Sequence, residues 1–139
     1  MVNESHDIYR VFGDQPGKSL LVFGAIHGNE PCGPTAINKI ISEFKSNERQ
    51  LSCGSVTFIP VCNKKAYEQG LRHTGQDMNR VFNTYVSPKT LTEERAHYLA
   101  FMVSQHDALL DVHSCGAQSP AYVMIDYENP VMDAWADAL

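Results

Sequence analysis

The residues best suited to chemistry are a histidine and a glutamate three positions apart, His27 and Glu30, within the glycine-rich stretch 24–31. An apolar run, 20–23, precedes this stretch, which predicts that both side chains lie just beyond the end of a strand. A neutral imidazole and a carboxylate are two of the three protein ligands that a catalytic zinc ion commonly takes. The pair therefore predicts part of a metal site, although such a pair also occurs by chance.

A third ligand must come from elsewhere in the chain, and His113 is the best candidate. It stands at the end of another apolar run, 108–112, which indicates a buried strand. Asp111 precedes it by two positions, so both side chains face the same side of an extended strand. Asp111 either orients the imidazole from outside or is a solvated or capping aspartate, and both interpretations stay open.

The same glycine-rich stretch nearly matches a phosphate-binding loop. Residues 28–35 fit the pattern G-x-x-x-x-G-K-[ST] except that Pro34 replaces the lysine. This replacement removes the ammonium group that contacts phosphate, and proline has no backbone N–H to donate. Glu30 would also place a negative charge where phosphate binds, so we interpret the match as accidental.

Length, charge and composition limit the possible classes of protein. The 139 residues, 43% hydrophobic and 19% charged, suit one globular domain with its own core. A net charge of -5 argues against a nucleic-acid partner, and no apolar run approaches the roughly 18 residues of a membrane helix. The polar N-terminus is not a signal peptide, so we expect a cytoplasmic protein with reduced cysteines.

The pattern of apolar residues predicts an α/β fold. The predicted strands are 8–12, 20–25, 55–61, 108–112 and 121–125. Helical spacing over 36–44 lies between two of these strands and predicts a βαβ unit. We therefore expect a mostly parallel or mixed sheet flanked by helices, with 8–12 and 20–25 forming a hairpin.

Two further helices are predicted towards the C-terminus. Residues 90–93 have the form of a capping box and begin one helix, which ends near Gln105. Asn129 and Pro130 begin the other, with Leu139 on its apolar face and no stop signal after it. We therefore expect residues 1–139 to be a single catalytic domain that is incomplete at its C-terminus. Apolar surface left on the last helix could pair with another copy, giving a homo-oligomer.

Ligands of open α/β sheets bind beyond the carboxyl ends of the strands. His27, Asn63 and His113 each follow a predicted core strand, so we expect all three at the same rim. The segment 64–88 near this rim has little periodicity, and long loops of this kind are usually functional. Its interleaved apolar residues predict that it packs onto the domain.

Two arginines of this loop, Arg72 and Arg80, are candidates for binding a carboxylate. Arginine is favoured where a carboxylate is held by two parallel hydrogen bonds. A pair of solvated surface arginines is the equally simple alternative.

Three short motifs together resemble a known family. Residues 27–31 (H-G-N-E-P), 77–82 (D-M-N-R-V-F) and 111–113 (D-V-H) have the order and approximate spacing of the succinylglutamate desuccinylase/aspartoacylase family. That family has the zinc carboxypeptidase-like fold. The resemblance extends from about Leu20 to His113, and the combination is far more specific than any one motif.

The resemblance implies one zinc ion per chain and a small-molecule substrate that carries a carboxylate. The implied zinc ligands are His27, Glu30 and His113. The resemblance also implies that Asn79 and Arg80 hold the substrate carboxylate, while Arg72 polarises the scissile carbonyl. The spacing of eight between these arginines resembles this family, whereas peptide-cleaving zinc carboxypeptidases usually have a wider gap. The implied activity is hydrolysis of the amide bond of a small N-acyl amino acid.

In this family a glutamate well downstream of the third zinc ligand accepts the proton of the attacking water. The acidic residues after His113 are Asp126, Glu128, Asp133 and Asp137. None of them matches the motif around that glutamate, so we expect the general base to be missing from these 139 residues. The isolated chain should then turn over poorly even if it binds zinc.

Three other functions stay open. A zinc carboxypeptidase or amidase that acts on a peptide would use the same ligands. A catalytically incomplete binding domain would keep the scaffold without the base. A cysteine hydrolase would pair Cys115 or Cys62 with a histidine, but no oxyanion loop is evident and a buried structural thiol is the simpler interpretation.

Overall fold

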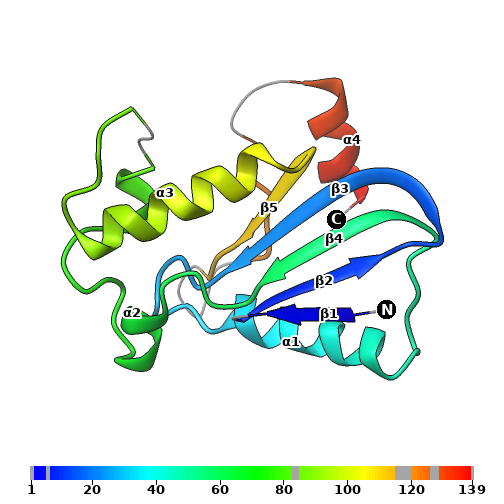
Figure 1. The fold of residues 1–139 in the computed structure, drawn as a ribbon, viewed down its shortest axis with the longest axis horizontal. Helices are drawn as coiled ribbons and strands as arrows, with labels where there is room; N and C mark the ends of the chain where they lie inside the picture. Colours follow the sequence, from blue (N-terminus) through cyan, green and yellow to red (C-terminus); the bar gives the residue numbers. More distant parts are fainter. Residues whose placement is uncertain (1, 6, 83–84, 115–119, 126–128, 139) are drawn as a thin grey trace.

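The computed structural model describes residues 2–5, 7–82, 85–114, 120–125 and 129–138. At its centre is a five-stranded sheet with the order β1-β2-β4-β3-β5 (Figure 1). The strands are β1 (Val2–Ser5), β2 (Ile8–Phe12), β3 (Gln15–Gly24), β4 (Cys53–Ile59) and β5 (Ala108–Val112). β3 is parallel to both β4 and β5, whereas β2 is antiparallel to β1 and β4. The predicted α/β class with a mixed sheet is confirmed.

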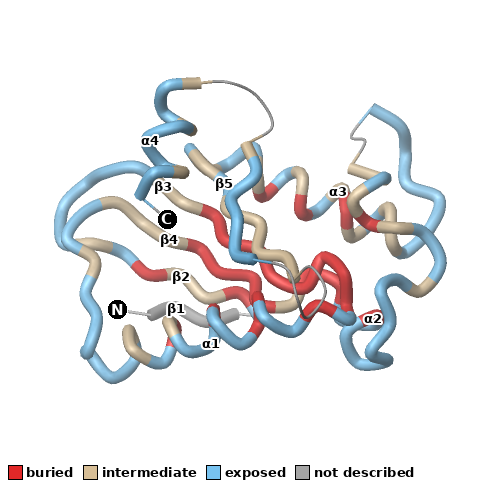
Figure 2. The backbone as a smooth tube through the Cα atoms, turned by 180° about the vertical axis from the view of Figure 1, so that it is seen from behind, coloured by how far each residue is buried: buried red, intermediate tan, exposed pale blue. Residues whose placement is uncertain are grey.

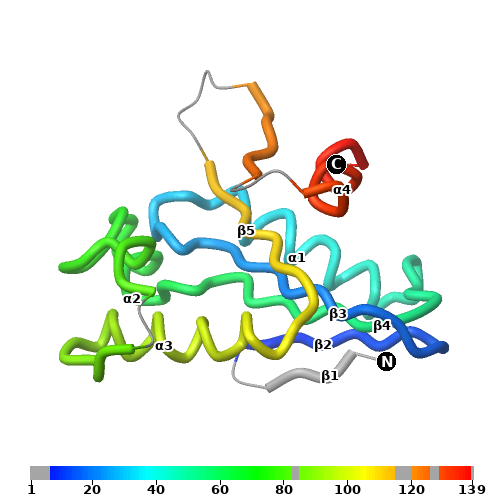
Figure 3. The backbone as a smooth tube through the Cα atoms, turned by 90° about the horizontal axis from the view of Figure 1, so that it is seen from above, coloured from blue at the N-terminus to red at the C-terminus, as the bar shows by residue number. Residues whose placement is uncertain are grey.

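Helices cover both faces of this sheet. They are α1 (Cys32–Lys45), α2 (Lys64–Glu68), the short 3-10 helix η1 (Met78–Arg80), α3 (Leu91–Ser104) and α4 (Pro130–Ala138). α1 links the parallel strands β3 and β4, as the predicted βαβ unit requires. α1 and α3 lie on opposite sides of the sheet (Figure 3). Among the described residues, no helix combines the length and apolar character needed to cross a bilayer.

The interior strand β3 contributes to both hydrophobic cores. Leu21 and Phe23 pack with Leu99 and other residues on the α3 side of the sheet. Val22 packs with Ile37 on the α1 side. Alternate side chains of a strand point to opposite faces, so a strand buried on both faces has a continuously apolar sequence. This burial confirms the interpretation of the run that precedes His27.

The predicted hairpin between 8–12 and 20–25 is wrong. β4 lies between β2 and β3 and pairs with both of them. β2 instead forms a hairpin with β1, through a turn in which Asp7 has a φ of 64°. A strand that is apolar on both faces needs a neighbour on each side and a helix layer on each face. β3 therefore takes a central place, and its first residues extend the strand back to Gln15.

The predicted strand at 121–125 is also wrong, because these residues have no strand assignment. Tyr122, Val123 and Met124 are exposed rather than packed. A high content of strand-forming residues gives a strand only where packing and a neighbouring strand support it.

α4 begins where the sequence predicted, with Asn129 Oδ1 accepting a hydrogen bond of 2.9 Å from the Val131 N–H. None of its described residues is buried, and Figure 2 shows the helix coloured as exposed over most of its length. Leu139, predicted on its apolar face, lies outside the described residues.

Among its described residues, the long segment 64–88 packs in part onto the domain, as predicted, on the α3 side of the sheet. Met78 is only 2% exposed, and Val81 and Phe82 pack against the same core. Leu71 is an exception because it is exposed. α3 begins with the predicted capping box, in which the side chains and backbone N–H groups of Thr90 and Glu93 bond each other reciprocally.

Candidate metal centre

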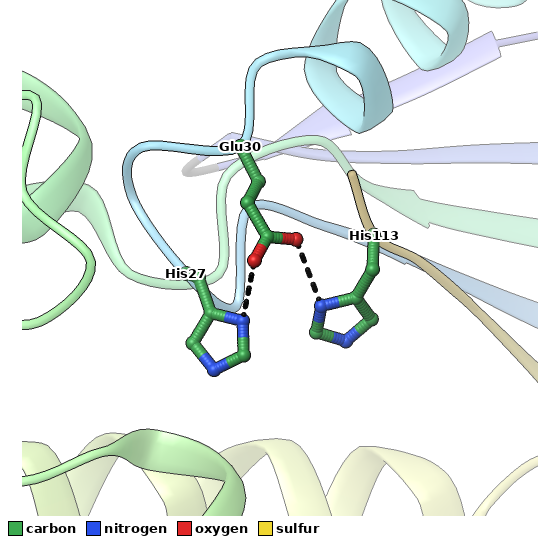
Figure 4. Close-up of side chains that lie close together, drawn as sticks. All are labelled: His27, Glu30 and His113. Atoms are coloured by element: carbon green, nitrogen blue, oxygen red, sulfur yellow. Dashed lines mark hydrogen bonds and ion pairs between the residues drawn. The ribbon is translucent and has the colours of Figure 1, made fainter. Parts of the chain in front are cut away.

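Three side chains predicted as metal ligands lie together at the carboxyl ends of β3 and β5 (Figure 4). Glu30 lies between the two histidines. Its Oε1 is 2.9 Å from His27 Nδ1, and its Oε2 is 3.0 Å from His113 Nδ1. The two imidazole rings are 4.9 Å apart between centroids. The structure therefore brings together residues that are more than 80 positions apart in the chain.

A tight turn after β3 delivers His27 and Glu30 to this rim. Ala25 has a φ of 46°, a left-handed conformation that is unusual for a residue with a Cβ and that turns the chain sharply. Gly28 then packs directly on α2: an added Cβ would lie 2.1 Å from the carbonyl carbon of Ala66. The motif therefore needs glycine at position 28 for close backbone approach, a reason that local sequence does not reveal.

α1 and β5 meet where Glu30 meets His113. The first turn of α1 touches the end of β5, since a Cβ on Gly33 would lie 2.9 Å from the Val112 carbonyl oxygen. Beyond His113, the Ser114 backbone N–H donates a hydrogen bond of 2.8 Å to Glu30 Oε2. This bond fixes one oxygen of the carboxylate in place.

A carboxylate supports each histidine from outside the cluster. Asp77 Oδ1 is 3.1 Å from His27 Nε2, and Asp111 Oδ2 is 2.9 Å from His113 Nε2. Of the two interpretations left open for Asp111, the hydrogen bond to the imidazole is the one observed. Sequence reasoning included Asp77 in the motif 77–82 but gave it no role, although aspartate is a favoured N-cap residue and its side chain does accept from the Asn79 N–H.

The chemistry of these donors fits a bound cation. An ionised carboxylate only accepts hydrogen bonds, so each Nε2 must carry a proton and donate it to Asp77 or Asp111. When Nε2 of a neutral imidazole carries the proton, Nδ1 is unprotonated and has a lone pair to share. Here both Nδ1 atoms face the oxygens of Glu30. A metal ion between Glu30 and the two Nδ1 atoms would satisfy all three groups.

The spacing of the ligand atoms also suits a small ion. One ligand atom from each residue lies within 4.8 Å of the others. Zinc bonds of about 2.1 Å in a tetrahedral site separate their ligand atoms by roughly 3.4 Å, so a small adjustment completes the geometry.

The pKa values of Glu30, Asp77 and His113 are shifted by their contacts with neighbouring groups. Burial alone would raise the pKa of Glu30, but the Ser114 N–H and the two imidazoles outweigh it and hold that pKa below its usual value. For Asp77, burial is likewise outweighed, mainly by the hydrogen bond from His27, so its pKa is lowered. The hydrogen bond to Asp111 raises the pKa of His113.

Arg72 joins this cluster, whereas Asn79 and Arg80 do not contact it. Arg72 Nη1 lies 3.2 Å from Glu30 Oε1, and its guanidinium is about half exposed. Arg80 is exposed, and its Nη1 donates to the Asn79 carbonyl. Among the described residues, neither Asn79 nor Arg80 bonds to the three predicted ligands.

Asn63 was predicted at the same rim but serves the fold. Its side chain is buried, accepts from the Ala66 N–H and caps α2. Cys62 is 1% exposed, and burial raises the pKa of its thiol, which makes it a poor nucleophile. Cys115, the other candidate for a cysteine hydrolase, lies outside the described residues, as do Asp126 and Glu128.

Several known proteins resemble this chain in sequence. A family model described as the succinylglutamate desuccinylase/aspartoacylase catalytic domain matches residues 16–137. A probable aspartoacylase of Prochlorococcus marinus subsp. pastoris is 30% identical over 105 residues, covering 72% of this chain and 34% of the relative. An N-alpha-acetyl-L-2,4-diaminobutyric acid deacetylase of Halomonas elongata is 30% identical over 103 residues, covering 72% of this chain and 29% of the relative.

Solved structures agree with these relatives. A succinylglutamate desuccinylase/aspartoacylase from Rhodobacter sphaeroides superposes with a TM-score of 0.65 at 28% identity, covering 77% of this chain and 33% of that one. An aspartoacylase family protein from Mesorhizobium loti gives a TM-score of 0.64 at 30% identity, covering 76% of this chain and 33% of that one. The chain thus spans about a third of the length of these proteins. With its motifs, its fold and the family model in agreement, the chain belongs to the succinylglutamate desuccinylase/aspartoacylase catalytic-domain family.

Proposed function

We propose that this chain carries the zinc site of a hydrolase that cleaves the amide bond of a small N-acyl amino acid. The observation that carries the proposal is the arrangement of Glu30 between two imidazoles whose Nδ1 atoms both face it. The relatives named aspartoacylase and deacetylase support the same class of reaction. We assign one zinc ion per chain to His27, Glu30 and His113.

The protein groups around this site have distinct tasks in the proposed reaction. A zinc ion held there would supply positive charge and a water molecule with a pKa near 7. Asp77 and Asp111 keep the two imidazoles in the tautomer that presents Nδ1 to the ion, and the Ser114 N–H holds Glu30 in place.

The arginines serve the substrate in this proposal. Arg72 already lies at the edge of the cluster, where its guanidinium can stabilise negative charge that develops on the scissile carbonyl oxygen. Arg80, exposed and without a carboxylate partner among the described residues, is assigned with Asn79 to the substrate carboxylate. We do not assign the carboxylate that accepts the proton of the attacking water to any of these residues. We therefore expect the 139-residue chain to bind zinc but to hydrolyse its substrate slowly.

Zinc titration of metal-stripped protein tests the ligand assignment. We expect one tight site in the wild type and a loss of affinity of about a hundredfold or more in His113→Ala, since a ligand contributes at least as much as the groups that orient it. His73→Ala is the matched control, because His73 is exposed in the same segment as Arg72 and is not a proposed ligand. Unchanged affinity in His113→Ala, or no binding to folded wild type, would overturn the zinc assignment.

Substrate binding tests the other half of the proposal. Zinc-loaded protein is titrated with a panel of N-acetyl amino acids and with C-terminal dipeptides. We expect the N-acetyl amino acids to bind better and Arg80→Gln to weaken their binding by about tenfold without changing zinc affinity. Preference for the dipeptides would instead favour a peptide-trimming enzyme.

A further inference from the structure

A hollow in the described part of the structure is lined by none of the candidate metal ligands. It occupies about 470 Å³ between α2, the segment 74–78 and the first turn of α3. Figure 1 shows α2 and the start of α3 together at one end of the molecule, and Figure 3 places them at the same end from another side. None of the three proposed metal ligands lines this hollow.

The segment 74–78 contacts both the hollow and the candidate metal centre. Gln76 lines the hollow, while its neighbour Asp77 bonds to His27 at the metal centre. Neighbouring residues of one segment therefore serve two different sites.

The charged residues that line this hollow are all basic: Lys64, Lys65 and Arg95. Lys64 is paired with Asp7 at 3.1 Å, so its charge is partly neutralised. Arg95 is half-buried, and its Nε donates a hydrogen bond of 3.0 Å to the Cys62 carbonyl, which orients the guanidinium. Lys65 and Arg95 therefore provide most of the local positive charge.

Glu93, which lies among the lining residues of the first turn of α3, takes part in the α3 cap. Both oxygens of Glu93 are engaged, Oε1 by Gln76 and Oε2 by the backbone N–H groups of Lys89 and Thr90. The first-turn N–H groups of Leu91 and Thr92, which line the hollow, precede any intrahelical acceptor. The start of α3 thus adds two backbone donors to the two basic side chains, while Glu93 and Glu94 in the same turn offset the positive potential of the helix end.

The remaining lining is apolar or weakly polar. Cys62 and Met78 are buried, and Leu91 is 75% exposed at the edge. A ligand that fits both parts has an oxyanion on one side and a short apolar portion on the other.

We propose that this hollow binds a small organic anion, through a phosphate or carboxylate group held by Lys65, Arg95 and the first turn of α3. The site is independent of the zinc assignment, since it shares no proposed ligand with the metal centre. A test of this site therefore gives a result that does not depend on the proposed hydrolase activity.

Amide-resolved NMR of the 139-residue chain tests this site, with inorganic phosphate and malonate as probes at constant ionic strength. We expect saturable shifts at the amides of Leu91 and Thr92 with at least one probe. Saturable shifts with phosphate alone identify a phosphate ligand, and saturable shifts with malonate alone identify a carboxylate ligand. Saturable shifts with both probes identify a site that accepts either kind of oxyanion. An absence of saturable shifts with both probes would refute the site.

Variants distinguish this hollow from general attraction of anions. We expect Lys65→Gln to weaken binding by about tenfold, as for a charge-assisted hydrogen bond, and Arg95→Gln to weaken it at least as much. Lys39→Gln, which removes an exposed lysine from α1 on the other face of the sheet, is the control and should bind as the wild type does.

Equal affinities in wild type and Lys65→Gln would overturn the proposal. Lys65 is exposed, so its substitution keeps the test valid if Arg95→Gln does not fold.

Discussion

The two sides of the candidate metal centre are built differently. The side chains of His27 and Glu30, which follow the interior strand β3, are 4% and 9% exposed, whereas the His113 side chain at the end of edge strand β5 is 29% exposed. Beyond Ser114 no described residue is buried (Figure 2). One side of the site is therefore positioned by core packing, and the other mainly by the hydrogen bond that His113 Nε2 donates to Asp111. Substitutions on the two sides should have different consequences for stability.

The largest effect on stability is expected at the packed side, from Gly28→Ala. The added Cβ would lie 2.1 Å from the Ala66 backbone, and backbone cannot move aside as a flexible side chain can. We expect a loss of about 3 kcal/mol or more in the free energy of unfolding, measured by chemical denaturation. Gly70→Ala is the control: Gly70 has a φ of +64° but open space around it, so the loss should be about 1 kcal/mol. Equal losses at the two glycines would contradict the close approach.

Core truncation compares the two regions directly. Met78→Ala removes a side chain that is 2% exposed in the core beneath the packed side, and we expect a loss of about 2 to 5 kcal/mol. Trp135→Ala, on α4, should change the free energy of unfolding by no more than about 0.5 kcal/mol, because the helix buries none of its described residues. Urea denaturation of both variants measures the difference. A large loss from Trp135→Ala would show that the C-terminal region is packed after all.

The two carboxylates that bond the histidines from outside the cluster, Asp77 and Asp111, allow the two sides of the site to be compared directly. Asp77→Ala and Asp111→Ala should each weaken zinc binding by about 10- to 100-fold, since each removes the group that orients a ligand. Asp77→Ala should also cost about 1 kcal/mol of stability, because Asp77 caps η1. Asp111→Ala should cost little, since Oδ1 of Asp111 is buried with no partner among the described residues. Parallel zinc titration and thermal unfolding separate the two effects, and an equal loss of stability in both variants would contradict the asymmetry.

The smallest effect is expected at the opposite end of β5, at Asp107. Hydrogen bonds from Lys18 and Ser19 hold the pKa of this carboxyl below its ordinary value. A lowered folded-state pKa favours the charged form, so the stabilisation is present above the unfolded pKa of about 3.9 and is lost as the pH falls below it. Asp107→Asn should therefore lower the melting temperature at neutral pH and make it less sensitive to acid. Adding Lys18→Met to Asp107→Asn should cause little further loss, and a full additional loss would show that the two residues act separately.

The pattern of neighbouring residues predicted those features of the fold that depend on nearby positions in the chain. The order of apolar strands placed His27 and His113 at one rim, because parallel strands share their carboxyl ends. The capping box at Thr90 and the proline-led start of α4 were also predictable, since helix ends are determined by a few neighbouring residues.

Features that depend on distant contacts were not predictable in this way. Asp77 supports His27 across 50 positions, and Gly28 is required because α2 packs against it. β2 pairs with β1 and β4. The periodicity of the sequence cannot show which of the possible neighbouring strands β2 pairs with. For residues 121–125, strand-forming composition alone was insufficient, because a strand also needs a neighbour.

The contact between Glu30 and His113 joins positions 83 residues apart. An ion held by both would act as a cross-link that closes this length of chain, and closing such a loop removes entropy from the unfolded chain. By the loop-entropy relation used for disulfides, the stabilisation amounts to about 4.5 kcal/mol for a linkage absent from the unfolded state. Occupancy of the site would then report whether the edge strand β5 has docked, and the last strand of the sheet would owe part of its stability to the metal.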